Sequence, residues 1–200
     1  MNNPGYMELV EAARHPADPV TLAFAGVIAL APTRAAPYDV SIAGLDAAAV
    51  YALRARHFPR LPASFELAGG YGSGGAREDE FSDLVGLLLE HRTLVDEEST
   101  WLAYATATAS MSENHLWQDM GLPDRAMLSW LMSRHFASLA VRNTGDMKWK
   151  KFFYKQLCER AEINVCKAPS CGVCADYSVC FGPEHAEPRV LVETRRAPHE

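Results

Sequence analysis

Four of the five cysteines of this chain lie within fifteen residues, close to its C-terminal end. They form the pattern C-x4-C-x2-C-x5-C, made by Cys166, Cys171, Cys174 and Cys180. A thiolate is a soft, negatively charged ligand, and four of them on one short segment can surround a single soft metal or one iron–sulfur core. The residues between them are mostly small, so the backbone can turn until all four sulfurs point inward. The sequence therefore predicts a metal-cluster loop, and the rest of the chain must supply the hydrophobic core.

Three other uses of these cysteines compete with an iron–sulfur site. Structural zinc takes the same four sulfurs, but zinc ribbons usually place two C-x2-C pairs far apart, and here only Cys171 and Cys174 have that spacing. Two disulfides would need an oxidising compartment, and we recognise no export signal at the N-terminus. A redox pair of the thioredoxin type would need a βαβ context that the sequence does not show. The spacing favours the iron–sulfur interpretation among these four.

The chain outside the cysteines has the composition and periodicity of a helical domain. Hydrophobic residues make up 48% of the 200 residues, which suits one globular domain with its own core. Phe81, Leu84, Val85 and Leu88 fall at positions i, i+3, i+4 and i+7, the spacing of one apolar helix face. No internal repeat or ladder of strands is recognisable. We predict a mainly α fold, a single helical domain with a C-terminal cysteine-rich metal-cluster loop.

Three parts follow from this division. The helical body spans 1–165 and contains a glycine-rich connector at about 68–76. The cysteine cluster loop spans 166–185 and is expected to pack on the body. A polar tail, 186–200, has a composition that favours disorder.

Capping and turn residues divide the body into helices. Asp18 and Pro19 supply an N-cap and a first residue for a nearly all-apolar helix that should be buried and end before Pro32. Ser99 or Thr100 is expected to cap a later helix. The predicted helices span about 1–14, 19–31, 47–56, 78–92, 100–121, 123–143 and 147–160.

The glycine-rich connector contains a formal G-x-G-x-x-G from Gly70 to Gly75. A dinucleotide loop of this kind needs a preceding parallel strand and a βαβ unit, and residues 65–67 make a poor strand. The acidic run at 78–80 would also repel phosphates. We therefore interpret the segment as a flexible connector and predict no nucleotide site.

Charge and hydropathy exclude two classes of partner. The formal net charge is −6 and no long basic block is present, so nucleic acid is not an expected partner. The longest apolar run, Val20 to Pro32, is about thirteen residues, too short to span a bilayer. It lacks the basic flank of a signal peptide. We expect a cytoplasmic protein without a membrane partner.

A few side chains outside the cluster could assist a metal. His115 stands beside an apolar pair on a predicted helix, where it is either a hydrogen-bonded structural residue or an additional ligand. Lys148, Lys151 and Lys155 share one side of the last helix, as a solvated surface or as a positive field for an anionic cluster or an oxyanion such as molybdate. Cys158, on the same helix, is expected to be a small core residue. No catalytic residue is predicted.

Several stretches together resemble the NifQ family of nitrogen-fixation proteins. They are the cysteine motif, its Cys180-Phe181-Gly182 exit, the stretch 115–122 beginning His-Leu-Trp-Gln-Asp, and the stretch 147–154, Met-Lys-Trp-Lys-Lys-Phe-Phe-Tyr. The resemblance runs from about residue 77 to residue 184 and is sharpest over its last seventy or so residues.

This resemblance implies a carrier of molybdenum and an iron–sulfur cluster (Mo–Fe–S), which supplies molybdenum for the iron–molybdenum cofactor of nitrogenase. The family's cluster ligands map onto Cys166, Cys171, Cys174 and Cys180. The implied partners are the nitrogenase iron protein, the cofactor scaffold complex and a molybdenum source such as molybdate. Such a protein is a metal donor and not an enzyme.

Two functions of other classes remain open from the sequence. A zinc-stabilised interaction domain would use the same four thiolates. An iron–sulfur enzyme with radical chemistry would have C-x3-C-x2-C, whereas the first gap here is one residue longer and no barrel-like strand pattern accompanies it.

Overall fold

The computed structural model describes residues 3–72, 78–162, 171, 174 and 177–184, and the regular elements among them are all helical. This confirms the predicted mainly α fold. In chain order the elements are α1 (Pro4–Ala12), α2 (Pro19–Ala29), the 3₁₀ turn η1 (Ala31–Thr33), α3 (Ala47–His57), α4 (Glu78–Glu90), α5 (Glu97–Ser110), α6 (Leu116–Asp119), α7 (Arg125–His135), α8 (Ala137–Ala140), α9 (Trp149–Arg160) and α10 (Tyr177–Phe181).

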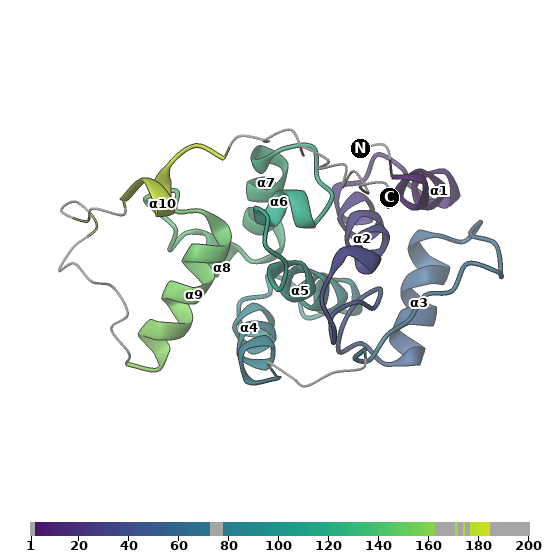
Figure 1. The fold of residues 1–200 in the computed structure, drawn as a ribbon, viewed down its shortest axis with the longest axis horizontal. Helices are drawn as coiled ribbons and strands as arrows, with labels where there is room; N and C mark the ends of the chain where they lie inside the picture. Colours follow the sequence, from purple (N-terminus) through teal and green to yellow (C-terminus); the bar gives the residue numbers. More distant parts are fainter. Residues whose placement is uncertain (1–2, 73–77, 163–170, 172–173, 175–176, 185–200) are drawn as a thin grey trace, which may run out of the picture.

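Helix α5 lies in the middle of the body, where it packs against α2, α3, α4 and α6 (Figure 1). Its small residues explain how four helices can approach it. Ala103, Ala105, Ala107 and Ala109 are all fully buried, and alanine keeps the distance between helix axes short. The body is therefore built around a helix rich in small side chains. Trp101 is a larger buried residue of the same helix.

Helix α2 is the nearly all-apolar buried helix that the sequence predicts. Asp18 caps it as expected, since its Oδ2 accepts from the Thr21 amide at 2.9 Å. At Gly26 the helix touches the chain at Met120, because a Cβ added there would lie 2.1 Å from the Met120 carbonyl oxygen. Only glycine allows this backbone contact.

The predicted cap of α5 is wrong. Asp96, and neither Ser99 nor Thr100, is the N-cap, and its Oδ1 accepts from the Ser99 amide at 2.8 Å. Aspartate is an equally good cap, and its position three residues earlier gives the helix one more turn.

The predicted end of this helix is also wrong. It ends at Ser110, and a separate short helix, α6, begins at Leu116. The intervening residues 111–115 include a serine and an asparagine. The side chains of these two residue types compete with the helix for backbone hydrogen bonds. Asn114 Nδ2 donates to Asp119 Oδ1 at 2.9 Å, which stabilises the new turn.

The helix predicted over 123–143 is interrupted at Phe136, which separates α7 from α8. A residue distant in sequence causes the break. The Thr93 amide donates to the His135 carbonyl at 2.8 Å, and the Ala137 amide donates to Thr93 Oγ1 at 3.1 Å. These groups would pair within a continuous helix, so the contact with Thr93 replaces helical bonds.

The glycine-rich connector is paired with an earlier loop over its described part, residues 68–72. The Gly70 amide donates to the Leu45 carbonyl at 2.6 Å, and the Gly44 amide donates to the Gly70 carbonyl at 2.7 Å. The remainder of the connector, 73–76, lies outside the described residues.

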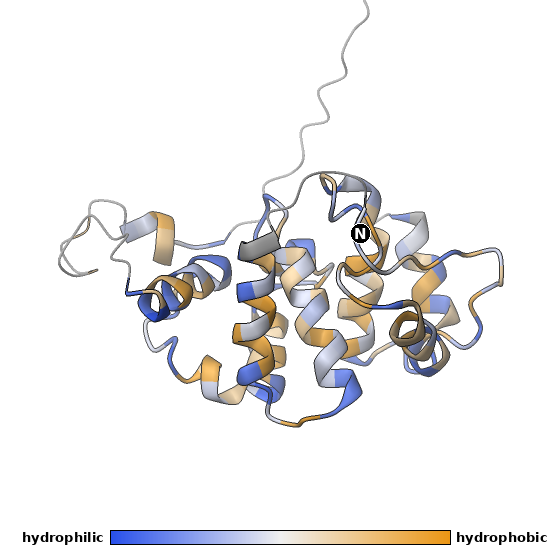
Figure 2. Cartoon of the chain, turned by 90° about the horizontal axis from the view of Figure 1, so that it is seen from below, coloured by the Kyte–Doolittle hydropathy of each residue, from blue (hydrophilic) through white to orange (hydrophobic). Residues whose placement is uncertain are grey.

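Helices α9 and α10 lie at one end of the long axis, and α1 and α3 lie towards the other (Figure 1). Figure 2 shows hydrophobic residues along the faces of the helices between these ends. The predicted cluster loop, 166–185, falls only partly within the described residues, and the predicted tail, 186–200, lies outside them. None of the helices in the described ranges has the length and apolar character needed to cross a bilayer.

Candidate functional site

Three of the four motif cysteines fall within the described residues, and backbone hydrogen bonds link Cys171 to Cys174 and Cys174 to Tyr177. The Cys174 amide donates to the Cys171 carbonyl at 3.2 Å, and the Tyr177 amide donates to the Cys174 carbonyl at 3.2 Å. Cys180 lies on α10, a helix that the sequence did not predict. All three cysteines are half-buried, and Cys171 and Cys180 pack against the edge of the core. Cys166 lies outside the described residues.

The chemistry of this donor set suits a soft metal or an iron–sulfur core, because the three described side chains offer only sulfur. Among residues 3–72, 78–162 and the described positions from 171 to 184, no group of three or more His, Cys, Asp or Glu side chains is close enough to hold a metal ion. The three described cysteines therefore do not form a closed metal site by themselves, and Cys166 lies outside the described residues.

Helix α10 is attached to the start of α9. The Lys148 amide donates to the Cys180 carbonyl at 2.8 Å, and Lys148 Nζ donates to the Ser178 carbonyl at 3.4 Å. The ring of Phe181 packs at Gly145, where an added Cβ would lie 3.1 Å from a ring carbon. The first turn of α9 thus holds the last cysteine of the motif. That helix begins at Trp149, two residues later than the sequence predicts, and the Lys148 amide, like the other amides at a helix start, has no partner within the helix.

The three predicted lysines have different surroundings. Lys148 contacts α10, as described above, whereas Lys151 is exposed. Lys155 forms an ion pair with Glu159 on the same helix, so its charge is partly balanced. Lys148 and Lys151 both stand at the N-terminal end of α9, where the helix dipole is also positive. Both lysines therefore lie at the end of α9 to which Cys180 is attached.

Lys150 is a charged residue of this region whose role the sequence analysis missed. Its Nζ lies 2.6 Å from Asp119 Oδ2 and 2.6 Å from the Ser112 carbonyl oxygen. Burial lowers the pKa of Lys150, while the carboxylate of Asp119 acts to raise it. This pair joins α9 to α6 and to the loop that precedes it.

His115 lies at the start of α6 and not on a helix face as expected. It is the N-cap residue, and its backbone amide donates to Gln118 Oε1 at 3.1 Å. The side chain is 31% exposed, and its Nδ1 lies 3.9 Å from Glu184 Oε2. The structure thus brings His115 near the residue four positions after Cys180.

Glu184 and its partner Arg125 were also missed. The Glu184 side chain is only 3% exposed, and its Oε1 lies 3.2 Å from Arg125 Nη1. One signal in the sequence could have revealed Arg125. Arg125 is the first residue of α7, where a positive charge opposes the helix dipole. This position indicates a contact with a residue outside that helix.

Cys158, the cysteine outside the motif, is half-buried on α9 as a free thiol. Its neighbour Leu157 packs against the core. The expectation that Cys158 is a core residue is therefore only partly met.

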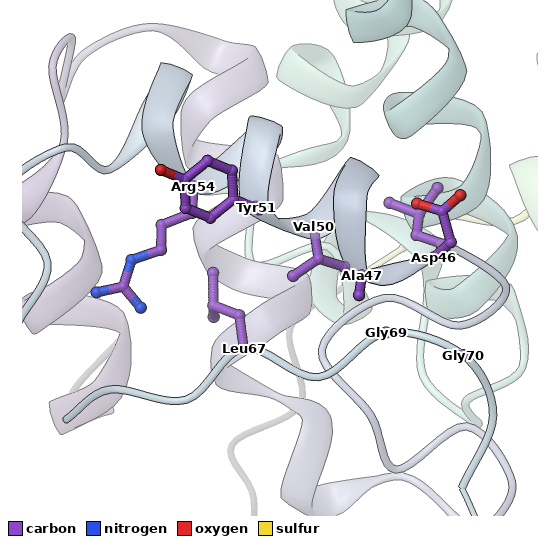
Figure 3. Close-up of a pocket in the computed structure, with 9 residues that line it drawn as sticks. Asp46, Ala47, Val50, Tyr51, Arg54, Leu67, Gly69 and Gly70 are labelled. Carbon is purple, nitrogen blue, oxygen red and sulfur yellow. The ribbon is translucent and has the colours of Figure 1, made fainter. Parts of the chain in front are cut away.

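A pocket of about 450 Å³ lies between α3 and residues 67–70 (Figure 3). Tyr51 and Arg54 stand at one end of it and Asp46 at the other. The guanidinium of Arg54 donates to the carbonyls of Phe65, Leu61 and Pro62, so its charge holds the adjacent loop. Helix α3 is at the end of the molecule away from α10 (Figure 1), so this pocket is separate from Cys180 on that helix.

Comparison with known proteins gives one family. The family model described as NifQ matches residues 23–182, which is most of the chain and includes all four motif cysteines. The chain belongs to the NifQ family.

Three curated relatives of this NifQ family member are named "Protein NifQ". It is 46% identical over 108 residues to "Protein NifQ" of Azotobacter vinelandii, a match that covers 54% of this chain and 55% of the relative. It is 41% identical over 98 residues to "Protein NifQ" of Rhodobacter capsulatus, covering 49% and 54%. It is 48% identical over 82 residues to "Protein NifQ" of Klebsiella pneumoniae, covering 40% and 48%.

The matched segments span about half the length of these curated NifQ relatives. No solved structure matches the chain significantly. Arg125 and the cysteines lie inside the region matched by the NifQ family model, and Glu184 lies two residues beyond it. Membership of this family places the chain among nitrogen-fixation proteins.

Proposed function

We propose that this NifQ family member carries a molybdenum–iron–sulfur cluster on Cys166, Cys171, Cys174 and Cys180 and donates its molybdenum for assembly of the iron–molybdenum cofactor of nitrogenase. The cluster would be held through iron–thiolate bonds, and it supplies a sulfide-rich site in which molybdenum can be kept for transfer. In this account the protein is a donor of metal and not an enzyme.

The donor set supports this proposal. Thiolates bind soft metals firmly and still exchange with the thiolates of another protein, which a donor requires. Cys174 and Cys180 are half-buried and α10 has no buried residue, so a partner protein can approach this segment. A segment that is accessible at the edge of the molecule suits transfer better than a site inside the core.

The large core of the body is the observation that favours a carried metal cluster over a structural zinc ion. Structural zinc is typical of small domains that cannot fold without it. Here the body has a large core of its own, centred on α2 and α5 with fully buried residues such as Phe24 and Leu102. Most of this core lies away from the cysteines, which favours a metal that the protein carries over one that it needs in order to fold.

Two groups near the motif would assist cargo capture. Lys148 and Lys151 at the positive end of α9 would attract an oxyanion such as molybdate and stabilise an anionic cluster. His115, whose imidazole is partly exposed, would be available as an additional ligand or as a hydrogen-bond donor to the cargo. The proposed acceptors are the cofactor scaffold complex and the nitrogenase iron protein.

Single replacements of the cysteines test the proposal. Each of Cys166→Ala, Cys171→Ala, Cys174→Ala and Cys180→Ala should lose much of its iron, sulfide and molybdenum after anaerobic purification, because each thiolate is a proposed ligand of the cluster and its loss weakens retention. Cys158→Ala is the matched control, since Cys158 is also a half-buried thiol and lies outside the motif. It should keep its metal. Full metal content in all four motif variants would refute the proposal, and zinc without iron would favour an interaction domain.

A further inference from the structure

Arg125 connects three segments of the chain that are distant in sequence. Its Nη1 lies 3.2 Å from Glu184 Oε1, and its Nη2 donates to Asp146 Oδ1 at 2.9 Å. The same Nη2 reaches the carbonyl oxygens of Asp146 at 2.8 Å and of Met147 at 3.0 Å. One guanidinium therefore joins the start of α7, the turn before α9 and the chain that follows α10.

The exposures of these side chains show which contact is protected from water. Glu184 is 3% exposed and Arg125 is 19% exposed, whereas Asp146 is 80% exposed. A carboxylate as buried as Glu184 is stable only with a charged or hydrogen-bonding partner. Arg125 lies closer to this carboxylate than His115 does, at 3.2 Å against 3.9 Å, so removal of Arg125 takes away its nearer charged partner in a place from which water is largely excluded.

Cys180 is itself attached to the start of α9, and the ion pair at Glu184 follows it in the chain. Three residues separate it from Glu184, and its carbonyl accepts from the Lys148 amide at 2.8 Å. Arg125 contacts the chain near both attachments. It binds Glu184 after α10, and it donates to the carbonyl of Met147, which immediately precedes Lys148. The Gly182 amide, which donates to the Ser178 carbonyl at 2.9 Å, continues the helical turn between the two attachments.

We propose that Arg125 and Glu184 are positioning residues that fix Cys180 on the helical body before any metal is bound. Neither residue supplies a sulfur ligand. Their effect is to hold the last thiol of the motif against the start of α9, which reduces the ordering that cluster binding must impose. The docking of Cys180 stands on the contacts alone, and its consequence for the cluster rests on the proposed function.

The docking is tested in the metal-free protein by Glu184→Ala. The control is Glu159→Ala, which also removes a glutamate from an ion pair, but at an exposed pair on the surface of α9. Hydrogen exchange of the peptide that covers 177–184 and the alkylation rate of Cys180 by iodoacetamide are measured by mass spectrometry. Both should rise about tenfold in Glu184→Ala, with exchange in α2 and α5 unchanged. Rates equal to those of the wild type would overturn the proposal.

A second variant separates positioning from a general loss of structure. Glu184→Gln keeps an oxygen that can accept from Arg125, and Asp146 still balances the charge of that arginine, so the rates should stay within about threefold of the wild type. If Glu184→Gln and Glu159→Ala both behave like Glu184→Ala, the ion pair has no specific role and the proposal fails.

The consequence for the cluster is measured after anaerobic reconstitution with iron and sulfide. Iron release to a chelator should be about tenfold faster in Glu184→Ala, and its electron paramagnetic resonance spectrum should change, because one ligand is less constrained. Glu184→Gln should restore both. Faster alkylation with unchanged iron release and spectrum would show that docking does not position the ligand set. If the wild type takes up no cluster, the proposed function fails while the metal-free comparison still decides the docking.

Discussion

Helices α5 and α10 are held in the molecule by different interactions. Helix α5 buries residues along nearly its whole length, and its neighbours are packed on several sides. Helix α10 buries none of its residues and is attached through the Lys148 amide, the ring of Phe181 and the buried ion pair at Glu184. Extensive apolar burial therefore stabilises the body, whereas a few local contacts, two of them polar, hold α10. The two regions should respond to different mutations.

The largest effect on the body is expected from Phe24→Ala. Phe24 is fully buried in α2, and its removal leaves a cavity that should lower the free energy of unfolding by about 3–5 kcal/mol. Urea denaturation measures this change. Metal content per folded molecule should not change, because the cysteines are attached elsewhere. Tyr51→Ala, which truncates a side chain that is 74% exposed, is the control and should change stability by less than about 0.5 kcal/mol.

A parallel loss of stability and of metal in Phe24→Ala would contradict the separation of the two regions. It would mean that metal binding by the cysteines depends on the packing of the whole body and not on the local contacts of α10 and Glu184.

Acidification should weaken the body through His57, whose Nδ1 lies 3.0 Å from Thr21 Oγ1. Burial lowers the pKa of His57 from 6.5 to about 4, and Arg56 acts in the same direction. Between these values the unfolded chain binds a proton that the folded chain does not. This stabilisation is therefore complete above pH 6.5 and is lost as the pH falls towards 4. The loss is about 3 kcal/mol.

Urea denaturation of the wild type and of His57→Gln at several pH values between 7 and about 4.5 tests this contribution. The variant should show a shallower fall of stability. Burial raises the pKa of Glu98, which opposes the effect of His57, and lowers the pKa values of His91 and His135, so some pH dependence should remain. The same fall in both proteins would exclude His57 as its source.

A smaller effect is expected from Lys150→Met, which tests the polar attachment of α9. The substitution leaves the buried carboxylate of Asp119 without its ammonium partner but with the hydrogen bond from Asn114, so stability should fall by about 2 kcal/mol. Lys155→Met removes a lysine from an exposed pair on the same helix and should cost less than about 0.5 kcal/mol. Equal effects of the two substitutions would show that burial of the Lys150 pair has no energetic consequence.

The features that the sequence predicts well are those with local causes. Helix α2 is recognisable because Asp18 and Pro19 mark its start and its apolar residues surround the whole axis. The periodicity of α4 likewise identifies its buried face, with Phe81, Leu84 and Leu88 in the core. The cysteine motif is visible because the spacing of its residues is itself the signal.

The missed features depend on residues far apart in the chain. Thr93 interrupts the predicted helix at Phe136, and no local property of that helix announces the contact. The partners of Glu184 and Lys150 are likewise distant in sequence. A basic residue in the first turn of a helix opposes the helix dipole. This was the one local sign that Arg125 and Lys150 make tertiary contacts.

The central claim is that the cysteine segment carries a molybdenum-containing iron–sulfur cluster. The most direct test is metal and acid-labile sulfide analysis, with electron paramagnetic resonance, on protein purified without oxygen from cells supplied with molybdate. The account predicts iron with sulfide, accompanied by molybdenum, and a spectrum of an iron–sulfur cluster. Zinc alone, with no sulfide even after anaerobic reconstitution, would contradict it and would assign the four cysteines to a structural metal.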